Sequence, residues 1–109
     1  MRIWDLPPKI LCRQHLLGEH RELHAIWSII TKKKSGYRRH PETMRWIGKL
    51  RALYYRHEKL VKEMTRRLYQ HQSPLKKKLA TGTAAQKTFV DIPRRQRQLL
   101  RNKRCSCKV

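Results

Sequence analysis

The stretch KILCRQHLLGEHRELHAIWSII, Lys9–Ile30, decides the fold. At about 100° per residue, its large apolar side chains fall on one side of a helix. That stripe comprises Cys12, Leu16, Leu23, Ile26, Trp27 and Ile30. An amphipathic helix of this length is therefore predicted, with the stripe, including Cys12, packed in a core.

Outside this stretch the chain predicts further helices and no convincing strand. A second periodic segment runs from about Leu50 to Gln70, with Leu53, Leu60, Val61, Met64 and Leu68 on one face. Pro41 marks a helix start and Pro93 another. The basic segment 76–87 lacks periodicity and is expected to be flexible. We therefore expect an all-α fold, with residues 1–109 forming one small bundle of about three helices with long basic loops.

The order of residues in HRELH argues against a zinc protease. The zinc motif places Glu directly after the first His, whereas Glu22 here follows His20 by two positions and lies about 160° from His20 and His24 around the helix. These histidines are expected to be solvated. No metal is expected in the active site, although Cys12, His15 and the Cys105/Cys107 pair form a weaker metal-binding alternative.

A second face of the same helix is polar. It carries Gln14, His15, Arg21 and Glu22, and the small residue Gly18 leaves room above it. A glycine inside a helix costs about 1 kcal/mol relative to alanine, so Gly18 calls for a reason such as close packing or ligand access. From the residues alone, a solvated surface and a ligand site both remain open.

The charge points to a polyanionic partner. The chain has 28 Lys and Arg residues against seven Asp and Glu, a net charge of +21. No apolar run is long enough to span a bilayer, and the N-terminus lacks the apolar stretch of a secretory signal, so we expect an intracellular, cytoplasmic monomer that binds nucleic acid and no membrane.

The segment RIWDLPPKILCRQHLLGEHREL resembles the N-terminal region of the pyrimidine-dimer DNA glycosylases of the phage endonuclease V type. The correspondence includes Arg2-Ile3, Gln14-His15-Leu16, Glu19 and Arg21-Glu22-Leu23, without a gap. The resemblance is partial to about residue 70 and thin beyond. Two departures, Ala25 in place of a family arginine and the lack of an aromatic C-terminal tail, leave the preferred lesion open.

The resemblance implies a mostly helical enzyme without a cofactor that excises damaged pyrimidines from double-stranded DNA and nicks the strand by β-elimination. It implies the α-amine of Met1 as nucleophile, with Glu22 and His15 as further catalytic residues. Because Arg2 is large, Met1 is expected to be retained. DNA contacts are expected from Arg2, Gln14 and Arg21, and the charge pattern adds Lys32, Lys33, Lys34, Arg38 and Arg39.

The main alternative is a basic nucleic-acid-binding protein of ribosomal or nucleoid type that has no catalytic activity. The composition fits that class equally well. A protein that only binds nucleic acid, however, needs neither the spacing from the N-terminus to Glu22 nor the polar face around Glu22.

Overall fold

The computed structural model describes residues 2–70 and 73–109, and all regular elements among them are helical. In chain order these are η1 (Pro8–Ile10), α1 (Arg13–Thr31), α2 (Pro41–Met44), α3 (Leu50–Arg66), η2 (Lys77–Leu79) and α4 (Pro93–Arg101). The all-α prediction is confirmed. The described part has four α-helices where about three were expected. The two short ones, α2 and α4, begin at Pro41 and Pro93, the two starts that the sequence predicted.

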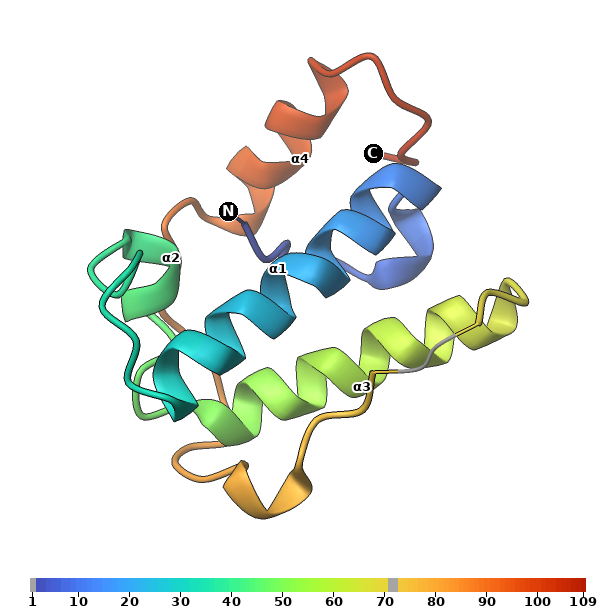
Figure 1. Cartoon of the computed structure of the whole chain (residues 1–109). Coiled ribbons are helices and arrows are strands. Elements are labelled where there is room, and N and C mark those ends of the chain that lie inside the picture. Colours follow the sequence, from blue (N-terminus) through green and yellow to red (C-terminus); the bar gives the residue numbers. More distant parts are fainter. Residues whose placement is uncertain (1, 71–72) are drawn as a thin grey trace.

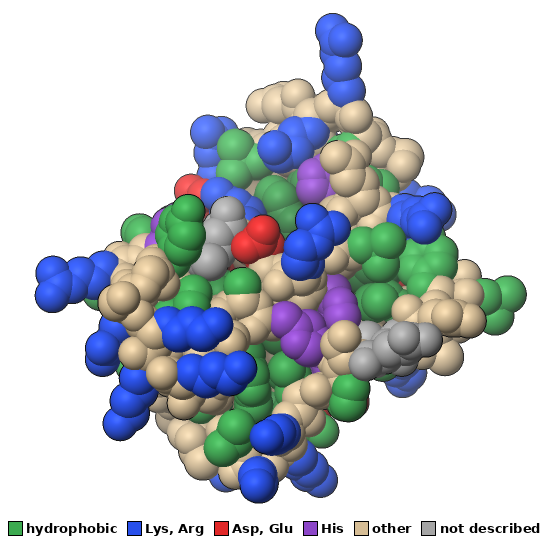
Figure 2. Space-filling model, in the orientation of Figure 1, with side chains coloured by type: hydrophobic (Ala, Val, Ile, Leu, Met, Phe, Trp, Pro, Cys, Tyr) green, Lys and Arg blue, Asp and Glu red, His purple; other side chains and the backbone are tan. Residues whose placement is uncertain are grey.

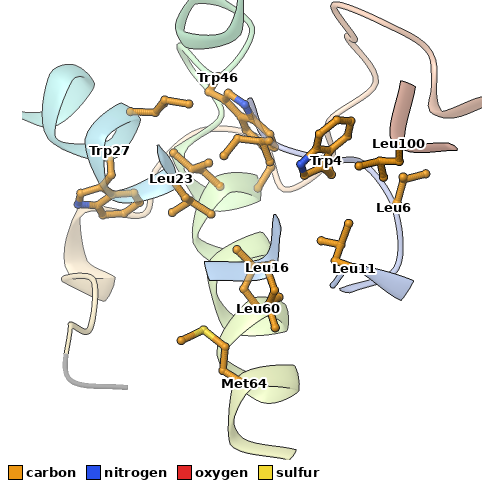
Figure 3. Packing of buried hydrophobic residues seen from close by; sticks show 14 residues of the cluster. Trp4, Leu6, Leu11, Leu16, Leu23, Trp27, Trp46, Leu60, Met64 and Leu100 are labelled. Atoms are coloured by element: carbon orange, nitrogen blue, oxygen red, sulfur yellow. The ribbon is translucent and has the colours of Figure 1, made fainter. Parts of the chain in front are cut away.

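The two long helices pack against each other and run in opposite directions (Figure 1). Apolar side chains of α1 and α3 meet in a core that also receives Trp4, Leu11, Trp46 and Leu100 (Figure 3). The predicted α1 stripe is buried, except that Ile30 is only partly covered. No helix in the described part is long and apolar enough to cross a membrane.

Local backbone geometry shortens both predicted long helices. The first begins at Arg13 rather than Lys9, because Pro8–Ile10 forms a 3-10 turn and Leu11 is extended. The second ends at Arg66, before Gln70. Leu68 has a left-handed φ of 63°, and the Tyr69 N–H donates to the Met64 carbonyl at 2.9 Å, which closes the helix with a Schellman motif. Leu68 was expected on the apolar face but is 91% exposed, since it lies beyond this closure.

The basic segment 76–87 contacts the start of α3. The carbonyls of Thr81 and Thr83 accept the Arg51 and Ala52 N–H groups at 2.8 and 3.1 Å, satisfying donors that a helix leaves open at its first turn. A Cβ at Gly82 would overlap the Gly48 carbonyl, so this close approach requires glycine. The expected flexibility of the segment stays a prediction, while these bonds define where it docks.

Residues 3–6 form a largely buried extended segment that pairs with no strand in the described part of the chain. Its N–H groups donate to side-chain oxygens instead of to another strand. The Ile3 N–H donates to Glu42 at 2.9 Å, the Trp4 N–H to Glu19 at 3.1 Å and the Asp5 N–H to Gln96 at 2.7 Å. Glu19, Glu42 and Gln96 are each at most 3% exposed and come from α1, α2 and α4 respectively. Three helices thus fix the position of the N-terminal segment.

Candidate active site

The polar face of α1 opens into a pocket of about 710 Å³. The start of the chain and α4 form its other walls. Its lining comprises Arg2, Trp4, Gln14, His15, Gly18, Glu19, Arg21, Glu22, Leu99 and Lys103. Five side chains singled out from the sequence therefore meet at one site: Arg2, Gln14, His15, Arg21 and Glu22. Gly18 lies in the same wall with nothing within 4 Å of the place a Cβ would take, so glycine leaves this wall open.

Glu22 is half-buried in this pocket. Among residues 2–70 and 73–109, no hydrogen bond or ion pair engages its carboxylate. Glu19 lies three residues earlier, and both oxygens of its carboxylate are already hydrogen-bonded. Arg56 donates to them at 2.7 and 3.0 Å. Figure 2 shows one face of the molecule, with few acidic groups and many Lys and Arg side chains. The open carboxylate of Glu22 is therefore the one available to a ligand.

His15 stands between the pocket and a group of thiols. Its ring meets Trp4 edge-on, with centroids 5.8 Å apart, while Nδ1 lies 3.0 Å from the Cys12 sulfur. Burial and the positive charge of Lys103 lower the pKa of the imidazole below its usual value. A lowered pKa favours the neutral form of the imidazole.

Met1, the expected nucleophile, lies outside the described residues. Arg2, its neighbour in the chain, lines the pocket and forms an ion pair with Asp91 at 3.0 Å. The guanidinium of Arg2 also lies over the Trp4 ring, 5.1 Å from its centroid. These contacts, with the three side-chain acceptors beneath residues 3–5, hold the start of the described chain at the pocket.

The remaining predicted DNA contacts lie apart from the pocket. Lys32, Lys33, Lys34, Arg38 and Arg39 are exposed in the loop that follows α1. Lys32 is ten positions after Glu22 and directly follows α1, a rise of about 15 Å along the helix.

Besides Gly18, four residues of the pocket were not predicted as site residues. These are Trp4, Glu19, Leu99 and Lys103. Trp4 and Glu19 stand within the stretch that carries the family resemblance, which was the one available signal. Leu99 and Lys103 are brought in by α4 and the turn after it, and local sequence spacing gave no sign of that contact.

His20 and His24 are not the solvated pair expected from the sequence. Both face away from the Glu22 pocket and meet His57 of α3, whose side chain is buried. The His24 Nε2 atom lies 3.2 Å from the Nε2 atoms of both His20 and His57. The expectation failed because α3 packs across this side of α1. The resulting cluster offers three nitrogen ligands, and Glu22 has no part in it.

The family model for pyrimidine dimer DNA glycosylases matches residues 1–77. The chain belongs to this family. Searches of curated proteins and of solved structures give no match.

Membership of the family makes DNA the substrate and glycosylase activity the general function. Most of the pocket comes from the matched residues, including all of its α1 wall and the N-terminal segment. Leu99 and Lys103 come from beyond the matched residues.

Proposed function

We propose that this protein is a DNA repair glycosylase with an associated abasic-site lyase activity, acting on damaged pyrimidines in duplex DNA. The observation that carries the proposal is the pocket in which an uncommitted Glu22 lies among Arg2, Gln14, His15 and Arg21, next to the fixed N-terminal segment. The family match supports the glycosylase activity, and the pocket chemistry supports the lyase step.

In the proposed reaction, the free α-amine of Met1 attacks the sugar C1′. The new N–C1′ bond replaces the glycosidic bond, and the base leaves with a proton. An α-amine has a pKa of about 7.7–8.0, so roughly a tenth or more is unprotonated near neutral pH, far more than for a lysine. It is therefore a usable nucleophile without a metal or cofactor.

Glu22 then acts as the general base toward the sugar. As the sugar ring opens, the amine and C1′ form an imine, which acidifies the hydrogens on C2′. The Glu22 carboxylate removes one of them, and the 3′ phosphate leaves by β-elimination. Water finally hydrolyses the imine and restores the free amine. His15, through Nε2–H, is suited to donate a hydrogen bond to the sugar or to Glu22.

The cations of the pocket and the basic loop bind the phosphates on either side of the lesion. Arg2 and Arg21 bind the phosphates next to the pocket. The exposed side chains at 32–34 and 38–39 bind phosphates further along the duplex. A lesion weakens stacking, so turning the damaged nucleotide out of the duplex costs less than for a normal one. This accounts for selectivity without a base-reading motif.

An incision assay tests the proposal. Three end-labelled duplexes are compared under identical conditions: one with a single thymine dimer, one with a single abasic site and one undamaged. We expect cleavage of the first two, with a 3′ unsaturated aldehyde end as the mark of β-elimination. Binding to all three without cleavage would instead establish the alternative, a basic DNA-binding protein without catalytic activity.

A further inference from the structure

A group of three thiols and one imidazole lies where the C-terminal tail meets the start of α1. Cys12 is the N-cap residue of α1, His15 lies in its first turn, and Cys105 and Cys107 belong to the tail. The potential ligand atoms of all four residues lie within 4.8 Å of one another. The His15 Nδ1 atom is 3.0 Å from the Cys12 sulfur and 3.3 Å from the Cys107 sulfur.

We propose that Cys12, His15, Cys105 and Cys107 bind a zinc ion that fastens the C-terminal tail to the start of α1. Three cysteines and one histidine are a usual ligand set for structural zinc, which is tetrahedral with Zn–S of about 2.3 Å and Zn–N of about 2.0–2.1 Å. Neighbouring ligand atoms in such a site lie about 3.5–3.8 Å apart. The four atoms here need only small rotations about side-chain bonds to reach these separations.

The surroundings of the thiols suit a bound cation. The Cys12 N–H donates to the Cys107 sulfur at 3.1 Å, a contact that orients a ligand from outside the metal's own shell. Cys12 is also the N-cap residue of α1, where the helix dipole favours a thiolate. A disulfide would use two of the sulfurs and would leave one thiol and the imidazole without a role.

The tail is already positioned by its backbone. The Lys108 N–H donates to the Ile10 carbonyl at 2.7 Å, and the Arg101 side chain donates to the Val109 carbonyl at 2.8 Å. Figure 1 shows the C-terminus beside the beginning of α1. A zinc ion here would therefore complete an existing contact.

This ion would be structural and would stand next to the pocket rather than in it. His15 would bind zinc through Nδ1, which leaves its other nitrogen free. Lys103 and Leu99, both in the pocket lining, lie just before the tail cysteines in the chain. The ion would hold that wall of the pocket in place. The inference rests on the four ligands alone and does not depend on the proposed glycosylase and lyase chemistry.

Cobalt(II) substitution tests the site in the full-length protein, purified under reducing conditions. Cobalt bound by thiolates gives a near-ultraviolet charge-transfer band that nitrogen ligands do not produce, so the band separates this site from the His20–His24–His57 cluster. We expect the wild-type protein to show the band and to lose it when zinc is added in competition. Cys105→Ser and Cys107→Ser lie in the tail, outside the main core, and should each weaken the band severalfold or abolish it.

Two matched variants serve as controls. Ser106→Ala changes the exposed residue between the two tail cysteines, and His20→Gln with His24→Gln removes nitrogen ligands of the other cluster. Both should keep the thiolate band. Chelation of zinc from the wild-type protein should also speed tryptic cleavage after Lys103 and Arg104, because the tail is released.

The proposal is overturned if the reduced wild-type protein holds no zinc and gives no thiolate band with cobalt. It is equally overturned if the band survives Cys107→Ser and Cys105→Ser together, or if Cys12 and Cys107 are found joined in a disulfide after reducing purification.

Discussion

Glu19 and Glu22 lie less than one turn apart on α1, yet they belong to two different regions of the molecule. Glu19 is buried, accepts two bonds from Arg56 and one from the Trp4 N–H, and so ties α1 to α3 and to the N-terminal segment. Glu22 faces the pocket and is uncommitted among the described residues. The Glu19 carboxylate thus helps to hold α1, α3 and the N-terminal segment together, and we call these buried contacts the framework. The Glu22 carboxylate is available for chemistry in the pocket.

The same division applies to the arginines. Arg45 is buried and bonds to Glu42, Asp5 and the Ile3 carbonyl, while Arg56 also bonds to the Leu6 carbonyl. Arg2 and Arg21 line the open pocket. These buried charges bond to residues 3–6 and hold that segment in place. The proposed nucleophile is the amine of Met1.

The largest expected effect comes from Glu22→Gln. Loss of a general acid–base group typically lowers the rate by about 10²–10⁴-fold, and we expect a loss of strand nicking in that range. DNA binding and the free energy of unfolding should change little, because the carboxylate contributes no contact to the framework. The measurement is single-turnover cleavage of an abasic duplex. Glu58→Gln, which removes an exposed glutamate of α3, is the matched control, and equal rates for the two variants would make Glu22 an ordinary surface residue.

Glu19→Gln should instead act on stability. It leaves the Arg56 guanidinium, only 12% exposed, without its charged partner, and breaking a buried ion pair costs about 3–5 kcal/mol. Urea unfolding of this variant beside Glu22→Gln measures the contrast directly. If the two variants unfold at the same urea concentration, the distinction between the framework and the pocket carboxylate is wrong.

A smaller effect is expected from the basic loop. Replacing Lys32, Lys33 and Lys34 by Gln should reduce the dependence of log K on log salt by up to about 2.7, since each phosphate contact contributes about 0.9. The control neutralises Lys9, Lys59 and Lys62, exposed lysines gathered near Pro8 on another part of the surface. Equal salt dependence for the two triple variants would mean that net charge alone governs binding.

The smallest effect concerns a carboxylate that belongs to neither region. Hydrogen bonds and charge from Arg66 and Arg67 lower the pKa of Glu63 to about 2, against a partial opposition from burial. Because the folded pKa is below the unfolded value of 4.5, the stabilisation is present above pH 4.5 and is lost as the pH falls toward 2. We expect at most about 1 kcal/mol, since Arg66 is largely exposed.

Glu63→Gln is the measurement for this last effect. Its deficit in the free energy of unfolding should be present at pH 6 and should shrink steadily between pH 4.5 and pH 2. A deficit that does not vary over this range would show that the ion pairs do not hold the carboxylate ionised.

The helices and the polar face of α1 could be predicted because their determinants are local. The spacing of Leu16, Leu23 and Trp27 defines the buried stripe, and the same spacing places His15 and Glu22 on one side. The buried segment 3–6 could not be predicted, because its hydrogen-bond partners come from three separate helices. Lys103 and His57 joined their clusters for the same reason, through contacts between residues far apart in the sequence. The group of Cys12, His15, Cys105 and Cys107 was a weaker alternative from the sequence, and the structure brings these four residues together.

The central claim is that the α-amine of Met1 forms an imine with DNA, and borohydride trapping on a duplex with one abasic site tests it most directly. Borohydride reduces the imine to a stable amine, and peptide mapping then locates the bound residue. We predict an adduct on the N-terminal peptide, and its loss, together with loss of nicking, when the α-amine is acetylated. An adduct on Lys103, the lysine of the pocket, or normal nicking by a protein with an uncleaved N-terminal tag would contradict the account.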